Sequence, residues 1–500
     1  MPRCSLVRLL ALASTVVAIA PDLQIQTTSG LVHGIYNDTA QTVRAFLGIP
    51  YAEAPINELR FSPPVAKSPI SADQPIDASK FGPPCPQTFS YDNESIWSIL
   101  PYNPWNTANI SEDCLSVNVW TPVTSNTASQ DEKKAVLMFV HGGAYMQGAG
   151  SVGFYDGSEV VKEHGDVLVV TFNEAAADES YDSYRLNVFG FPNAPGLNLA
   201  DQNVGFLDQR LAVEWVHRNI ANFGGDPDRI LLFGQSAGSG SVDTYAYAYP
   251  DNPLVSAIAL LSGTASILPN LDLSHSNWNN LSTALGCGSG EESLSCMRQT
   301  RWEVIVKEMG TNQYTPVYDN RTRFEDLAQR AKRGGVARVP TLGGITAREF
   351  SASIPLSSTE VDETTILEAV YNQFSCPLSE TLKRRMEQDI PTWRYVYHGN
   401  FTNLSPTPWL GAYHSSELPM IFGTHNQSTL PSPTQPNEVA VSKYIQGALV
   451  AFAKDPENGL LDYGWPEFSF NGRTLVNLGV GNRPGAVLSS IDEWDAHCSA

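Results

Sequence analysis

The chain has few basic residues, no metal-binding cysteine motif and, after its first twenty residues, no long hydrophobic run. It contains 31 Lys and Arg against 52 Asp and Glu in 500 residues, a formal net charge of −21. Nucleic-acid binding requires clustered Lys and Arg, so we expect no nucleic-acid partner. No Cys-x-x-Cys pair or histidine cluster is present, so the sequence predicts neither a metal site nor a cofactor. No later stretch is long and apolar enough to cross a bilayer, so no transmembrane segment is expected.

The first twenty residues have the pattern of a secretory signal peptide. Arg3 and Arg8 precede a mostly apolar run over residues 9–20, which is too short for a membrane-spanning helix. Cleavage is expected after Ala20, with Ala18 as the alternative. The predicted mature chain therefore covers residues 21–500 and is secreted.

Cysteines and glycosylation sequons agree with an oxidising, secretory route. Cys4 leaves with the signal peptide, and an even number of cysteines remains. Cys287 and Cys296 are close neighbours in a Gly/Ser-rich loop and are expected to pair. Cys85 and Cys114 are the next expected pair, and Cys376 and Cys498 either pair or stay free. Eight Asn-x-Ser/Thr sequons predict N-glycans at Asn37, Asn93, Asn109, Asn280, Asn320, Asn400, Asn403 and Asn426.

Apolar runs separated by helical patterns predict an α/β fold. Residues 135–140 and 257–261 are apolar throughout, and residues 167–172 are apolar except for Thr171, which is typical of strands buried on both faces. Residues 208–223 and 439–454 have helical spacing, and residues 23–35 suggest an N-terminal hairpin. Further strands are expected at 116–122, 230–233, 339–342 and 393–397. No linker or repeat divides the chain, so we expect a single domain over residues 21–500, with a large mostly parallel twisted sheet covered by helices on both faces.

The segment 229–240 joins an apolar strand to a stretch of small residues that predicts a helix. Between them Ser236 lies in the sequence GQSAG, the Gly-x-Ser-x-Gly pattern of a nucleophile elbow. Such a turn exposes the serine hydroxyl at the positive end of a helix. A chance Gly/Ser turn has the same pattern, so partner residues must support the hypothesis. An activated serine needs a base, an orienting acid and an oxyanion hole.

Two histidines compete for the role of base. His414 lies in a loop of small residues after the predicted strand that ends at Tyr397, where a base would project over the sheet. His398 follows that strand directly and is expected at the surface.

Three carboxylates compete for the role of orienting acid. Glu349 follows an apolar strand and is the favoured partner of His414, with Asp243 and Glu417 as alternatives. The structural alternative for Glu349 is an ion pair with Arg348 or a lysine on a surface loop.

Oxyanion donors are expected from two backbone segments. The run from His141 to Ala144 follows a strand and contains two glycines, which let N–H groups point at a developing oxyanion. Gly143, Ala144 and the residue after the nucleophile, Ala237, are the candidate donors.

These residues resemble those of the type-B carboxylesterases, the family of cholinesterases and of fungal lipases and esterases. The resemblance spans nearly the whole mature chain and rests on FLGIPYA at 46–52, SEDCL at 111–115, NVFGF at 187–191, FGGDP at 223–227 and GQSAG at 234–238. It implies an α/β-hydrolase fold and a carboxylic ester hydrolase that acts on small-molecule or lipid esters through an acyl-enzyme. The implied catalytic triad is Ser236, Glu349 and His414, with Gly143, Ala144 and Ala237 as oxyanion donors. The family's disulfides match Cys85–Cys114 and Cys287–Cys296.

The sequence departs from the family pattern in three places. Ala144 stands where a third glycine is common, and Phe350 follows Glu349 where glycine is frequent. An acidic segment at 174–183 interrupts a motif that otherwise runs from 172–173 to 184–185. With no basic residue and one large apolar side chain, it is expected to loop outward, unless it is an error in the gene model.

Two other functions stay open. A catalytically inactive binding protein of the same fold is one, although such proteins usually lack the serine. A cholinesterase is the other: Trp105 lies in the first disulfide loop, where that subgroup keeps a choline-binding tryptophan. Gln235, however, replaces the glutamate that assists cation binding there.

Overall fold

The computed structural model describes residues 19–88, 94–101, 110–123, 133–150, 152–172, 184–266, 272, 274–310 and 312–498. Three of the features discussed above therefore lie outside the described residues: most of the signal segment, Trp105 and the acidic segment 174–183. Asn93 and Asn109 also lie outside them.

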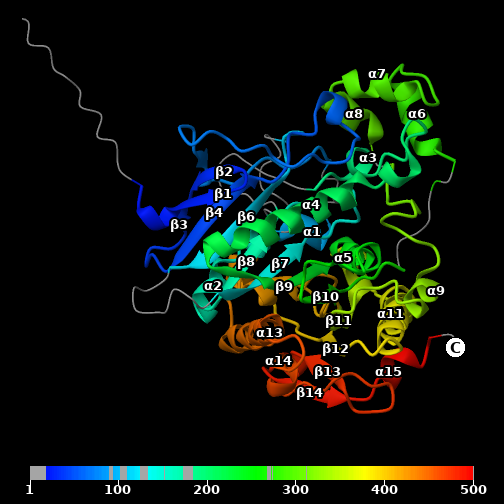
Figure 1. The fold of residues 1–500 in the computed structure, drawn as a ribbon. Coiled ribbons are helices and arrows are strands. Elements are labelled where there is room, and N and C mark those ends of the chain that lie inside the picture. Colours follow the sequence, from blue (N-terminus) through cyan, green and yellow to red (C-terminus); the bar gives the residue numbers. More distant parts are fainter. Residues whose placement is uncertain are drawn as a thin grey trace, which may run out of the picture.

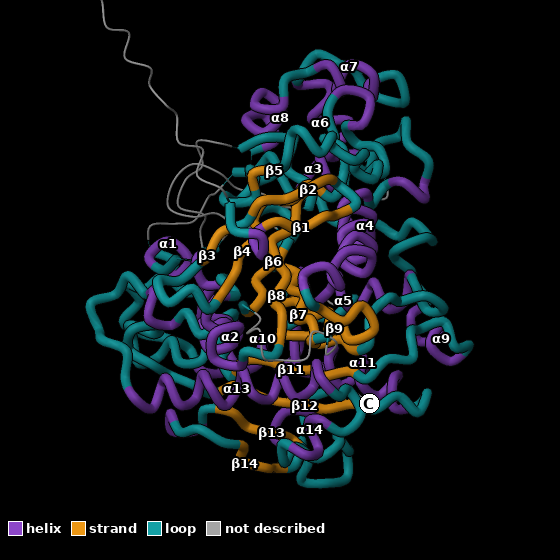
Figure 2. The backbone as a smooth tube through the Cα atoms, turned by 60° about the vertical axis from the view of Figure 1, so that its left-hand side comes forward, coloured by secondary structure: helices purple, strands orange, loops and turns teal. Residues whose placement is uncertain are grey.

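A mixed sheet of 11 strands runs through the whole molecule (Figures 1 and 2). In spatial order its strands are β14 (Ala486–Ser489), β13 (Leu475–Leu478), β12 (Thr392–Tyr397), β11 (Thr341–Thr346), β10 (Ala257–Leu261), β9 (Gly225–Gln235), β7 (Lys134–Val140), β8 (Val167–Thr171), β6 (Ser116–Pro122), β4 (Val43–Pro50) and β3 (Ile35–Tyr36). The seven strands from β13 to β8 are parallel, and the strands at both edges are antiparallel. The predicted α/β fold with a mostly parallel sheet is therefore confirmed. A second sheet, formed by β1 (Gln24–Thr27), β2 (Gly30–His33) and β5 (Ile76–Asp77), contains the predicted N-terminal hairpin.

Helices cover both faces of the large sheet, because its central strands are apolar on both sides. On β7, Leu137 and Phe139 belong to one hydrophobic core, which includes residues of α2 (Ser158–His164) and α13 (Pro436–Lys454). The alternate residues Val136 and Met138 belong to the other core, with residues of α4 (Val204–Asn219) and α5 (Ala237–Ala248). Figure 2 shows α2 and α13 on one side of the strands and α4 on the other. Because the strands from β13 to β8 are parallel, their carboxyl ends lie at the same edge of the sheet. The two cores support the sheet from both faces.

The other helices of the described residues complete this framework. They are α1 (Ile96–Ile99), α3 (Asn187–Gly190), α6 (Ser276–Ala284), α7 (Ser293–Gln299), α8 (Trp302–Met309), α9 (Leu327–Lys332), α10 (Glu363–Val370), α11 (Cys376–Met386), α12 (Leu418–Phe422), α14 (Gly459–Asp462) and α15 (Asp492–Asp495). Helices α6, α7 and α8 lie together at one end, far from β13 and β14 (Figure 1), and share a separate hydrophobic cluster. In the described residues no helix has the length and apolarity needed to cross a membrane.

Three disulfides connect these elements. Cys85 is joined to Cys114, Cys287 to Cys296, and Cys376 to Cys498. The third bond shows that Cys376 and Cys498 pair, which the sequence left open. It links α11 to the C-terminal segment.

Candidate active site

The turn at Ser236 links β9 directly to α5. Ser236 has φ 58° and ψ −124°, a conformation that L-residues rarely adopt. Its N–H donates to the Leu261 carbonyl at 2.8 Å, which fixes the turn to the end of β10. A Cβ on Gly234 would lie 2.4 Å from the Gly238 carbonyl oxygen, and one on Gly238 would lie 2.1 Å from the Val140 carbonyl oxygen. Both flanking positions therefore require glycine: Gly234 because of the turn itself, and Gly238 because the start of α5 lies against the end of β7.

The candidate oxyanion loop follows β7 at the same edge. Gly143 has φ 104°, and Ala144 has φ 57° although it carries a side chain. A Cβ at Gly143 would lie 1.9 Å from the Gln147 carbonyl oxygen, so only glycine fits there. The N–H groups of Gly143, Ala144 and Ala237 donate no hydrogen bond to any described residue. Ala237 is the first residue of α5, where helical N–H groups have no partner within the helix.

Side chains on three sides hold the oxyanion loop in place. The Tyr145 hydroxyl donates to the Ala237 carbonyl at 2.7 Å, which joins the loop to the start of α5. Gly148 N–H donates to Gln87 Oε1 at 2.7 Å. His141, 1% exposed, stacks on Tyr184 with ring centroids 4.6 Å apart, and burial lowers its pKa to about 4. A neutral imidazole is therefore packed beneath the loop.

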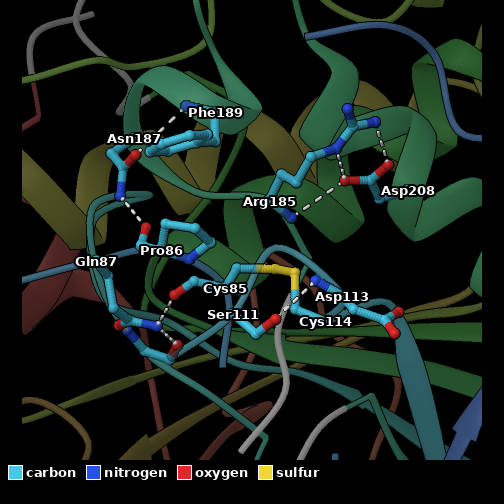
Figure 3. The surroundings of a disulfide bond; sticks show 11 residues. Cys85, Pro86, Gln87, Ser111, Asp113, Cys114, Arg185, Asn187, Phe189 and Asp208 are labelled. Carbon is cyan, nitrogen blue, oxygen red and sulfur yellow. Dashed lines mark hydrogen bonds and ion pairs between the residues drawn. A yellow bond between two sulfur atoms is a disulfide. The ribbon is translucent and has the colours of Figure 1, made fainter. Parts of the chain in front are cut away.

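The first disulfide supports the same loop through Asn187 (Figure 3). The Asn187 amide donates to the Pro86 carbonyl, next to Cys85, at 2.8 Å and to the Met146 carbonyl at 3.3 Å. Near Asn187, the buried Arg185 and Asp208 form an ion pair at 2.7 Å. The NVFGF segment and the disulfide thus act on the position of the oxyanion loop and do not contact the reacting atoms.

Glu349 and His414 come from the loops that follow β11 and β12. These strands pair in parallel, with Thr346 opposite Tyr397, so both loops leave at the same edge. Glu349 Oε2 lies 2.5 Å from His414 Nδ1, and Glu349 Oε1 accepts from the Thr346 N–H at 2.7 Å. The carboxylate is 2% exposed. This geometry orients the imidazole with its other nitrogen, Nε2, away from the acid.

The alternative assignments for these side chains do not match the contacts. Arg348 pairs with Glu363 at 2.6 Å and leaves Glu349 to His414. Asp243 pairs with Arg385 of α11 at 2.5 Å and accepts from the N–H of Ala265, in the loop after β10, at 2.8 Å.

Glu417 and His398 also make contacts that exclude them from the triad. Glu417 is 1% exposed and neither carboxyl oxygen has a hydrogen-bond partner among the described residues. Burial first, and then the neighbouring charge of Glu349, raise the pKa of Glu417 well above its usual range. His398 is half-buried rather than at the surface as expected; its Nε2 lies 2.9 Å from Asn477 Oδ1, and burial lowers its pKa.

A cavity of about 210 Å³ opens onto Ser236 and His414. Its described lining residues are Trp97, Gly142, Gly143, Ala144, Gln147, Gly148, Val152, Tyr155, Gln235, Ser236, His414 and Ser415. None of these carries an Asp, Glu, Lys or Arg side chain. Pockets that bury drug-sized ligands have about 300–1,000 Å³, so this space suits a smaller uncharged group.

Two aromatic residues beside His414 were missed as site residues from the sequence. The half-buried Trp97 on α1 has its ring centroid 6.2 Å from that of His414, and the ring centroid of Phe374 lies at 5.3 Å. Trp97 lies in the loop that the Cys85–Cys114 disulfide closes, and this position is the sequence signal that could have identified it. No local pattern distinguished Phe374.

Comparisons with known proteins agree with this geometry. A sequence model described as the carboxylesterase family matches residues 21–373 and 369–490. A chlorogenic acid esterase of Aspergillus niger is 38% identical over 483 residues, covering 95% of this chain and 88% of the relative. Secreted lipase 5 of Gibberella zeae is 33% identical over 513 residues, covering 94% and 93%. A para-nitrobenzyl esterase of Bacillus subtilis is 29% identical over 499 residues, covering 91% and 94%. The chain therefore belongs to the carboxylesterase family, has the α/β-hydrolase fold, and is a carboxylic ester hydrolase.

Proposed function

We propose that the protein is a secreted serine esterase that works through an acyl-enzyme, with Ser236 as nucleophile, His414 as base and Glu349 as orienting acid. The observation that carries the proposal is the buried Glu349 carboxylate 2.5 Å from His414 Nδ1, at the sheet edge where the strained Ser236 turn begins α5. A base held by a buried acid, in the same cavity as a half-buried serine, is the arrangement that acyl transfer requires.

The chemistry follows from these positions. Ser236 Oγ attacks the ester carbonyl while its proton passes to His414 Nε2, and Glu349 stays ionised and stabilises the imidazolium. The N–H groups of Gly143, Ala144 and Ala237 receive the negative charge that develops on the carbonyl oxygen. His414 then protonates the leaving alcohol, and water hydrolyses the acyl-enzyme by the reverse sequence of proton transfers. The described residues that line the cavity include no Asp, Glu, Lys or Arg, which favours uncharged esters.

Substitution of the nucleophile tests the mechanism. Ser236→Ala should lower kcat by about 10³-fold or more while leaving the fold intact, because the triad acts as one unit. An organophosphonate should label the wild-type enzyme at Ser236 and leave the variant unlabelled. Near-normal turnover by purified Ser236→Ala would refute the serine mechanism. A wild-type protein that is inactive and not labelled would favour the catalytically inactive binding protein.

A cholinesterase is less well supported, because Gln235 brings no negative charge to the cavity. Acetylcholine and its uncharged isostere 3,3-dimethylbutyl acetate differ only in the cationic centre. The uncharged ester should be the better substrate by kcat/KM, and a clear preference for acetylcholine would reverse this assignment.

Secretion and glycosylation complete the proposal. Its support is the signal-peptide pattern, the disulfides and the exposure of four sequon asparagines: Asn280, Asn320, Asn400 and Asn426. Asn37 is half-buried. Asn403 is removed from the glycosylation proposal, because it is 2% exposed and its amide donates to Glu438 at 2.8 Å and to the His425 carbonyl at 3.1 Å. Intact-mass analysis before and after endoglycosidase tests both processing and glycan number.

A further inference from the structure

Gln235 contacts the atom of His414 that the mechanism requires. It is the last residue of β9, it is 2% exposed, and its Nε2 lies 3.1 Å from His414 Nε2. With the Nδ1 proton of His414 directed at Glu349, Nε2 carries the lone pair of a neutral imidazole. The Gln235 amide therefore donates its N–H to the base.

The nucleophile does not have this contact. Among the described residues, the Ser236 hydroxyl has no hydrogen-bond partner. One imidazole lone pair accepts one strong hydrogen bond, so Gln235 and Ser236 compete for it. Resting on the proposed triad, we propose that Gln235 is a positioning residue that occupies His414 Nε2 in the substrate-free enzyme and must release it before Ser236 can transfer its proton.

The two ends of the Gln235 amide suit the two protonation states of His414. Gln235 Oε1 has no hydrogen-bond partner among the described residues, and the side chain lines the cavity. When the Ser236 proton reaches Nε2, the imidazolium becomes a donor there and the amide N–H can no longer bond to it. Rotation of the amide by half a turn presents Oε1, which accepts from the imidazolium. A glutamate at this position could serve only the protonated state.

Few charges lie near this contact. Glu349 approaches from the loop after β11, and Glu417 is buried on the loop of His414 itself. Tyr395 of β12 faces both carboxyl groups, and burial raises its pKa well above the usual range. Tyr413 precedes His414 in the chain and Tyr155 lines the same cavity, whereas Trp97, Phe374 and Gln235, which also approach the ring, do not titrate. A charge introduced at position 235 would therefore act on His414 from the side opposite to the Glu349 carboxylate, which contacts Nδ1.

Two substitutions separate release of the base from a change in its charge. Gln235→Met keeps the length of the side chain but cannot donate, so the rate of phosphonylation by an uncharged organophosphonate should rise up to about fivefold, the equivalent of one neutral hydrogen bond. Gln235→Glu cannot donate to the neutral base and stabilises the imidazolium, so the acidic limb of the pH profile of kcat/KM should move to higher pH. Gln147→Met is the matched control, because it removes an amide from the same cavity without touching His414.

Three results would overturn the proposal. They are phosphonylation of Gln235→Met that is no faster than that of the wild type, an acidic limb that does not move in Gln235→Glu, and an equal rate increase in Gln147→Met. Failure of the triad itself is distinguished by peptide mapping of the phosphonylated wild type, since the label would then be found away from Ser236.

Discussion

Replacing Glu417 by glutamine should make the stability of the protein less dependent on pH. The carboxyl is 1% exposed, lacks a hydrogen-bond partner among the described residues, and lies near Glu349, so its pKa is raised well above the usual range. Folding therefore favours the protonated form. In the unfolded chain the same group ionises near its ordinary pKa of about 4.3.

The sign follows from this difference in proton binding. Below the unfolded pKa both states are protonated and the group does not oppose folding. As the pH rises from there towards the folded pKa, the unfolded state gains stability by ~1.4 kcal/mol for each pH unit. Glutamine has the shape of the protonated acid and no proton to lose. The free energy of unfolding of Glu417→Gln should therefore exceed that of the wild type by an amount that grows by ~1.4 kcal/mol per unit above about pH 5.

Urea denaturation followed by tryptophan fluorescence at a series of pH values measures this difference. Glu467→Gln is the control, because Glu467 is exposed and its replacement should leave the slope unchanged. A constant difference between Glu417→Gln and wild type from pH 4 to pH 7 would falsify the reasoning. It would mean that Glu417 is ionised in the folded protein and compensated by a partner.

Three further substitutions test other parts of the structure. His414→Ala should lower kcat as much as Ser236→Ala, about 10³-fold or more. His398→Ala should have a small effect on kcat, because His398 contacts Asn477. Steady-state kinetics measure both effects, and inactivation by His398→Ala would reverse the assignment of the base. Asp243→Ala should lower the free energy of unfolding by about 3–5 kcal/mol, since it leaves the buried Arg385 guanidinium without its partner; a loss below 1 kcal/mol in urea denaturation would contradict this. Ala144→Gly should raise the free energy of unfolding by up to about 1 kcal/mol, because φ 57° is strained for alanine. A lower melting temperature of this variant would show instead that the methyl group of Ala144 packs favourably.

The sequence determined the features that depend on local sterics and on periodicity. Residues 135–140 are apolar on both faces, and this alone requires a strand covered on both sides, as β7 is. The helix predicted at 439–454 is α13, and the predicted helix at 208–223 is α4 with the short 3-10 segment that follows it. The elbow was recognisable because its two glycines stand at a fixed spacing around Ser236. A Cβ on Gly234 would meet Gly238 within the turn itself, whereas a Cβ on Gly238 would meet the Val140 carbonyl at the end of β7. Strands β13 and β14 were missed, because each has only four residues and little pattern.

The contacts of His414 were decided by the tertiary structure. Three carboxylates could have been the orienting acid of His414. No local sequence feature distinguishes Glu349 from Asp243 and Glu417 in this role. The parallel register of β11 and β12 brings Glu349 to His414, whereas Asp243 pairs with Arg385 of α11 and burial raises the pKa of Glu417. The same holds for Gln235, which is adjacent to Ser236 in sequence but whose amide meets an imidazole 179 residues away. Pairing between strands distant in sequence is a property of the whole sheet, so the sequence could propose the participants but not their contacts.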